Sequence, residues 1–122
     1  MKLLIVDDDV HIRKLLRIYL RSSGLELFDA ASAEEALAIF GQHDFEVIIL
    51  DLILPFYGGL RLCQKFKAKE REPKPYVILI TGDDSTETRE STAQAGADQF
   101  LGKPFSREQI VDLVTRVAEE RG

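Results

Sequence analysis

The sequence predicts an α/β protein with a doubly wound, five-stranded parallel sheet. Strand-like apolar runs alternate with helix-like segments five times along the chain, which implies parallel strands joined by right-handed crossovers. The run at residues 47–50 is unbroken, apolar and largely β-branched, as is typical of a strand buried on both faces. Five units are too few for a closed barrel, which needs eight, so an open sheet covered by helices is expected.

Size and composition indicate one globular domain, expected to span residues 1–122. Sixteen Lys and Arg against 21 Asp and Glu give a net charge of −5, which argues against direct nucleic-acid binding because such domains normally carry a basic face. No apolar run approaches the roughly 18 residues of a membrane span, and the first strand begins too early for a signal peptide. A single cysteine fits a reducing compartment, so we expect a cytoplasmic protein without membrane association.

Capping residues and glycines delimit the first two helices. Asp9 can cap the first helix, and Gly24 is expected to end it in a left-handed conformation. Ser32 begins a capping box for the second helix, which Gly41 ends. The expected strands lie at residues 2–6, 25–30, 47–50, 76–80 and 99–102.

The last three helices differ in the quality of their patterns. The third follows a loop with Pro55 and Gly58 and has Cys63 on its apolar, inward side. The fourth, at residues 83–96, offers mainly Thr and Ala to the sheet, so we predict that it is the most mobile helix. Ser106 begins another capping box for the fifth helix, whose apolar stripe is regular.

Polar side chains are expected to converge at one edge of this sheet. In the flavodoxin-like strand order 2-1-3-4-5, strands 1 and 3 are neighbours where the order reverses. Asp7 and Asp8 follow the first strand and Asp51 follows the third, so their carboxylates should lie close together. Thr81 and Lys103 follow the fourth and fifth strands at the same edge.

This set of side chains suits metal-assisted phosphoryl transfer. Carboxylates within a few ångströms repel one another unless a cation lies among them, and their hard oxygens suit Mg²⁺ or Mn²⁺. Lys103 adds a positive charge and Thr81 a hydroxyl donor for the oxygens of a phosphoryl group. Asp51 at the centre is the candidate nucleophile, which would form an aspartyl-phosphate.

The motifs, taken in order, span nearly the whole chain. They are Asp7-Asp8, Asp51-x-x-Leu-Pro-x-x-x-Gly59, Thr81 and Phe100-x-x-Lys103-Pro-Phe. Together they resemble the motifs of response regulator receiver domains of two-component signalling. The resemblance implies that Asp51 takes a phosphoryl group from the phosphohistidine of a kinase. It also implies a signalling domain rather than an enzyme, although one that assists its own Mg²⁺-dependent phosphorylation and slow dephosphorylation.

The resemblance assigns ligand roles to residues around Asp51. It makes Asp8 a direct Mg²⁺ ligand and Asp7 a ligand that acts through a metal-bound water. Asp51 and the backbone carbonyl of Ile53 would complete the protein ligands. Lys103 would pair with the phosphoryl group, and its bond to Pro104 is expected to be cis.

A switch is also implied, in which the Thr81 hydroxyl turns toward the phosphoryl oxygen and Phe100 rotates inward. The alternative for Phe100 is a role in core packing alone, and the two roles are compatible. Gly58 stands where the family more often has Asp or Ser, and Gly82 where Ala is common, so both should loosen their loops. These departures and the polar fourth helix affect the expected conformational switch. They do not change the residues expected to contact the metal or the phosphoryl group.

The implied partners are a histidine kinase or a histidine phosphotransfer protein, together with an output domain or downstream protein. The output would be reached through the last two helices and the last strand, and a phosphorylation-dependent homodimer is a further expectation. Val10, Lys14 and Ile18 share the outward stripe of the first helix beside the acids. We expect this stripe to dock the kinase, the alternative being an ordinary exposed face.

Two other functions are alternatives to a receiver domain. A phosphatase of the dehalogenase type needs a second acid two residues after its nucleophile, where this chain has Ile53, and it needs a cap domain or large insertions. An interaction module that keeps the fold without the chemistry would not need the acids or Lys103. Metal-dependent phosphorylation separates that module from a receiver domain.

Overall fold

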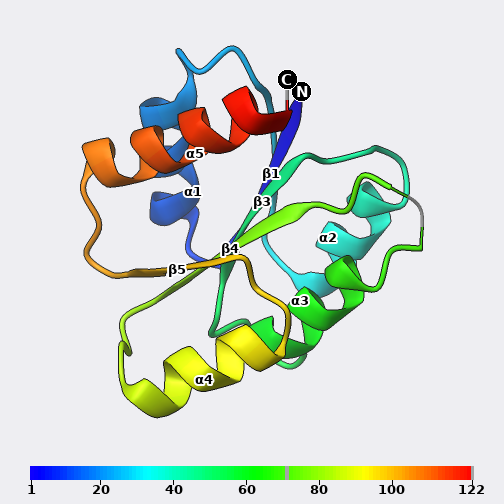
Figure 1. Cartoon of the computed structure of the whole chain (residues 1–122), viewed down its shortest axis with the longest axis vertical. Coiled ribbons are helices and arrows are strands. Elements are labelled where there is room, and N and C mark those ends of the chain that lie inside the picture. The colour runs from blue at the N-terminus through cyan, green and yellow to red at the C-terminus, as the bar shows by residue number, and fades with distance from the viewer. Residues whose placement is uncertain (71, 122) are drawn as a thin grey trace.

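The computed structural model describes residues 1–70 and 72–121, and within them five parallel strands form one sheet of order β2-β1-β3-β4-β5 (Figure 1). This confirms the predicted fold class and strand order. The strands are β1 (Lys2–Val6), β2 (Glu26–Ala30), β3 (Val47–Asp51), β4 (Tyr76–Thr81) and β5 (Gln99–Gly102). The helices are α1 (Val10–Leu20), α2 (Ala33–Phe40), α3 (Gly59–Lys67), α4 (Thr86–Gln94) and α5 (Arg107–Arg121).

The two faces of the sheet carry separate apolar cores. Side chains of α2 and α3 pack on one face, and those of α1 and α5 pack on the other. All five residues of β3 are buried because this strand lies between β1 and β4 and under helices on both faces. Leu3 pairs with Val47 and Val6 with Leu50. This register brings the carboxyl ends of β1 and β3 side by side.

The predicted helix starts are confirmed at the level of single hydrogen bonds. Asp9 accepts the His11 N–H at 2.8 Å, and Ser32 accepts the Glu35 N–H at 3.2 Å. At the start of α5 both arms of the capping box form, since Ser106 and Gln109 each donate a backbone N–H to the other's side chain.

One of the two predicted helix ends differs from the structure. Gly24 has a positive φ of 82°, but α1 already ends at Leu20 with Arg21 as its cap, so Gly24 turns the loop rather than the helix. Gly41 ends α2 as predicted, with a right-handed φ of −71°. At Gly24 the left-handed backbone is as predicted, but it lies in the loop beyond the end of α1.

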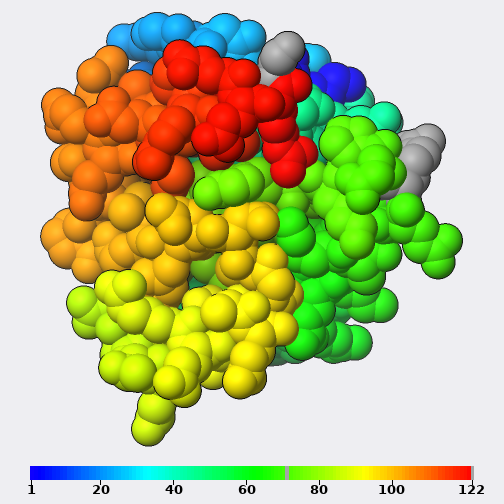
Figure 2. Space-filling model, in the orientation of Figure 1, coloured from blue at the N-terminus to red at the C-terminus, as the bar shows by residue number. Residues whose placement is uncertain are grey.

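Helix α4 is shorter than predicted and weakly packed. It covers Thr86–Gln94, and Thr92 alone of these nine described residues is buried. Its start is held by Ser85, which accepts the Thr88 N–H, and by Asp83, which accepts from Ser85 and Thr88. Figure 2 shows this yellow-green segment protruding at the lower edge of the molecule. Within residues 1–70 and 72–121, no helix is long and apolar enough to cross a membrane.

Candidate functional site

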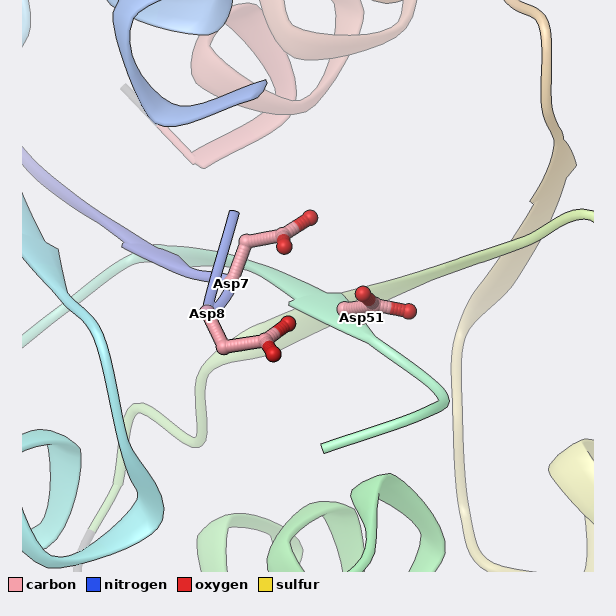
Figure 3. A group of neighbouring side chains, drawn as sticks. All are labelled: Asp7, Asp8 and Asp51. Carbon is pink, nitrogen blue, oxygen red and sulfur yellow. The ribbon is translucent and has the colours of Figure 1, made fainter. Parts of the chain in front are cut away.

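Three carboxylates meet where β1 and β3 end. Asp7 and Asp8 follow β1, Asp51 is the last residue of β3, and one oxygen of each lies within 4.8 Å of the others. In Figure 3, the side chains of Asp7 and Asp8 both extend toward Asp51. Asp7 and Asp51 are buried, whereas Asp8 is exposed. The predicted acidic cluster is therefore present and open to solvent on the side of Asp8.

Lys103 supplies the positive charge beside this acidic cluster. Its Nζ lies 3.4 Å from Asp51 Oδ2 and 3.6 Å from Asp7 Oδ2. The Lys103 N–H also donates to the Thr81 carbonyl at 2.7 Å, which fixes the start of its loop against β4. The bond between Lys103 and Pro104 is cis, as predicted.

Burial shapes the electrostatics of Asp7. It raises the pKa of Asp7 from 3.8 to about 6, and the nearby Asp51 charge adds to this rise. The Asp9 N–H, which donates to Asp7 Oδ1 at 2.9 Å, and the Lys103 ammonium both oppose it. Asp7 is therefore an acid whose charged form is unfavourable in the metal-free protein.

The donor set fits a small divalent cation. All three groups offer hard carboxylate oxygens, which Mg²⁺ and Mn²⁺ prefer. With metal–oxygen bonds of about 2.0–2.1 Å, the ligand oxygens of one octahedral Mg²⁺ lie roughly 3–4 Å apart. The spacing within 4.8 Å is thus close to what such an ion requires. A bound cation would also relieve the repulsion among the carboxylates.

The loop after Asp51 is built by its own backbone. The Ile53 N–H donates to Asp51 Oδ1 at 3.0 Å, and the Gly59 N–H donates to the Leu52 carbonyl at 2.9 Å. A Cβ at Gly59 would lie 2.5 Å from the Asp51 and Leu52 carbonyl oxygens, so only glycine fits this position. Gly58 has φ 92° and ψ 134°, a region that glycine alone adopts without strain. The glycine at 58 thus suits this backbone, where an Asp or Ser cap would not.

Thr81 and Phe100 lie on neighbouring strands. Thr81 is buried at the end of β4, and its Oγ1 accepts the Asp83 N–H at 3.1 Å. Phe100 is half-buried on β5, and the Arg89 guanidinium lies 4.7 Å from the centre of its ring. Phe100 therefore packs against a helix α4 side chain at the surface rather than in the core.

The chain matches the model of the response regulator receiver domain over residues 3–115. It belongs to this family. The receiver domain resembles the chemotaxis protein CheY4 of Vibrio cholerae with a TM-score of 0.88 at 30% identity, over 95% of this chain and 97% of that one. It resembles the BeF3-activated DrrB receiver domain with a TM-score of 0.87 at 32% identity, over 97% of both chains.

Curated relatives of this receiver domain are regulators. It is 33% identical to the transcriptional regulatory protein ResD of Bacillus subtilis (strain 168), over 90% of this chain and 45% of that protein. It is 34% identical to the regulatory protein VanR of Enterococcus faecium, over 95% of this chain and 48% of that protein. The chain therefore spans about half the length of these relatives.

The predicted docking stripe lies outside the acidic cluster. Val10, Lys14 and Ile18 are all exposed along α1 of the receiver domain, so the predicted outward face is present. Exposed apolar side chains also occur at Ile53 and Phe56, of which Phe56 has a positive φ of 68°.

Sequence reasoning missed two arginines: Arg13, which contacts Asp7, and Arg89, which contacts Phe100. Arg13 donates to the Asp7 carbonyl at 2.6 Å. Only the position of Arg13 in the sequence could have indicated this contact. Arg13 lies four residues after Asp9, one turn into the helix that follows the acids. Side-chain direction, which decides these contacts, does not follow from spacing alone.

Proposed function

We propose that this receiver domain accepts a phosphoryl group on Asp51 in a Mg²⁺-dependent reaction. The observation that carries the proposal is the position of Asp51, buried at the centre with Asp7, Asp8 and Lys103 around its carboxylate. The donor is a phosphohistidine of a kinase or of a histidine phosphotransfer protein. The same chemistry permits transfer from a small phosphodonor and slow hydrolysis of the product.

The roles of the side chains follow from their charges. A carboxylate oxygen of Asp51 forms the bond to phosphorus as the bond from phosphorus to the donor nitrogen breaks, and the released imidazole takes up a proton. Asp8, Asp51 and the Ile53 carbonyl would hold Mg²⁺ directly, and Asp7 through water. The ion supplies positive charge for the phosphoryl oxygens. Lys103, now shared between two carboxylates, is close enough to pair with the new phosphoryl group.

The conformational response is proposed to use Thr81 and Phe100. The Thr81 hydroxyl accepts the Asp83 N–H in this structure. When the hydroxyl turns toward a phosphoryl oxygen, it would release this hydrogen bond. Inward rotation of Phe100 removes its ring from the Arg89 guanidinium. Both changes loosen contacts of α4, which already has little buried surface.

Partners follow from the family and from the names of the relatives. We propose docking of the phosphodonor protein on the stripe of Val10, Lys14 and Ile18. The output, whether an attached domain, a downstream protein or a second copy in a homodimer, would be reached through α4, β5 and α5. The curated relatives are regulators about twice as long as this chain. From their names and from the family we infer a regulatory role, and we propose that it is exercised in the cytoplasm.

Intact mass after incubation with acetyl phosphate tests the proposal. With Mg²⁺ present we expect one phosphoryl adduct, which is absent without the metal and absent in Asp51→Asn. The same incubation of Thr81→Ala should still give the adduct, but more slowly, because Thr81 adds a hydroxyl donor for the phosphoryl oxygens while Asp51 forms the bond to phosphorus. A folded, Mg²⁺-supplied protein that stays unmodified would instead favour the interaction module.

A further inference from the structure

We propose that Arg13 is a positioning residue for the metal site. The guanidinium joins the Asp29 side chain of β2 to the main-chain carbonyl of Asp7, and so it sets the directions in which Asp7 and Asp8 present their carboxylates. This inference rests on the proposed binding of Mg²⁺ by those acids.

The contacts of Arg13 are short and partly shielded from water. Nη1 donates to the Asp7 carbonyl at 2.6 Å, and Nε donates to Asp29 Oδ2 at 3.2 Å. The Arg13 side chain is only 16% exposed. A planar guanidinium with several donors can hold two acceptors at once, which a lysine ammonium on a flexible stem does less well. Arg13 is thereby a fixed link between α1, β2 and the end of β1.

The carbonyl that Arg13 holds belongs to the peptide between two of the acids. In the preceding peptide unit, the Asp7 N–H donates to the Ala30 carbonyl at 3.2 Å, so the backbone of Asp7 is held on both sides of its Cα. Asp8 is exposed, so the direction of its carboxylate depends on the backbone that carries it. Outer partners that orient ligands in this way typically change metal affinity by 10–100-fold when they are removed.

Charge and position predict opposite effects on Mg²⁺ affinity. Arg13 is a cation near the proposed cation site, so loss of its charge alone would strengthen Mg²⁺ binding. Loss of its hold on the Asp7 carbonyl would weaken binding, because the ligands then have to be ordered when the ion arrives. The sign of the change in affinity therefore separates the two roles.

Arg17 provides a matched control on the same helix. Its Nη2 pairs with Asp29 Oδ1 at 2.7 Å and donates to the Leu27 carbonyl at 3.3 Å. It thus shares the Asp29 anchor with Arg13, but its described hydrogen bonds go to β2 and not to Asp7. A variant of Arg17 therefore loses a similar ion pair with Asp29, while the hydrogen bond from Arg13 to the Asp7 carbonyl stays intact.

The experiment is a Mg²⁺ titration followed by amide NMR shifts, with denaturant unfolding of each variant in metal-free buffer. We expect Arg13→Met to bind Mg²⁺ about tenfold more weakly than the parent, and Arg17→Met to bind within twofold of it. Arg13→Lys, which keeps the charge and the stem, should also lose severalfold in affinity. The unfolding midpoints of Arg13→Met and Arg17→Met should fall by similar amounts.

Three results would overturn the inference. They are unchanged or tighter Mg²⁺ binding by Arg13→Met, an equal loss of affinity in Arg17→Met, and parent-like binding by Arg13→Lys. If Arg13→Met does not fold, the more conservative Arg13→Lys still decides the question. A parent protein that binds no Mg²⁺ would refute the proposed metal site itself, which is a different outcome from variants that bind as the parent does.

Discussion

At the scale of single residues, burial makes the charge of Asp7 unfavourable in the metal-free protein. Its pKa in the folded state is about 6 against an ordinary value of 3.8, because the carboxyl is buried next to Asp51. Between pH 4 and 6 the folded protein thus holds a proton that the unfolded chain has released. The free energy of unfolding must therefore fall as the pH rises through this range, and level off above it.

Replacing Asp7 by Asn removes this cost. We expect Asp7→Asn to raise the free energy of unfolding by about 1–2 kcal/mol at pH 8 in EDTA, as measured with urea. The gain should shrink toward zero near pH 4, where Asp7 is protonated in the parent as well. Mg²⁺ should stabilise the parent more than the variant. Equal stability of the two proteins at pH 8 would contradict this account of the site.

At the scale of elements, the connection from β3 to α3 depends on Gly59. A methyl group there would lie 2.5 Å from two main-chain carbonyl oxygens, neither of which can move without displacing the end of β3. We expect Gly59→Ala to lower the free energy of unfolding by more than about 2 kcal/mol in urea unfolding. The same change at Gly82 meets open space, so Gly82→Ala should gain about 0.5 kcal/mol by restricting the unfolded chain. Similar effects at the two positions would show that the contact at Gly59 is not decisive.

Helix α4 is the element for which we predict the greatest mobility. Only Thr92 of its nine residues is buried, whereas α5 buries four apolar side chains. Native-state hydrogen exchange should show lower protection for α4 amides than for those of α1, α2, α3 and α5. A weakly buried helix opens at lower free energy than the whole domain. Protection of α4 equal to that of α5 would contradict the prediction.

At the scale of the whole molecule, the fold and the acidic cluster could both be predicted from the sequence. Alternating strand and helix patterns with a fully apolar third strand leave few topologies, and parallel strands bring their carboxyl ends to one edge. Asp7, Asp8, Asp51 and Lys103 then had to converge, because each lies at the carboxyl end of a strand or within two residues after it. Features that depend on the backbone topology can therefore be predicted from the order of apolar and polar residues along the chain.

Contacts decided by side-chain direction could not be predicted in this way. The arginine pairs with Asp29 and with the Phe100 ring depend on rotamers, and the spacing of residues gives only the helix face. The backbone conformation of Gly58 could not be predicted either, and its φ of 92° is one that glycine makes accessible. The conformation that a glycine adopts is set by the hydrogen bonds around it, and these are formed only in the folded chain.

The central place of β3 has a consequence for how this receiver domain could diversify. Asp51 ends a fully buried strand that is paired on both sides, while α4 at the periphery buries only Thr92. In the proposed response, a change at Asp51 would therefore be accommodated more readily at α4 than in the central sheet. Helix α4 contributes no ligand or reacting group to the proposed site. Substitutions in α4 would then alter the proposed conformational response while the residues that accept the phosphoryl group stay the same.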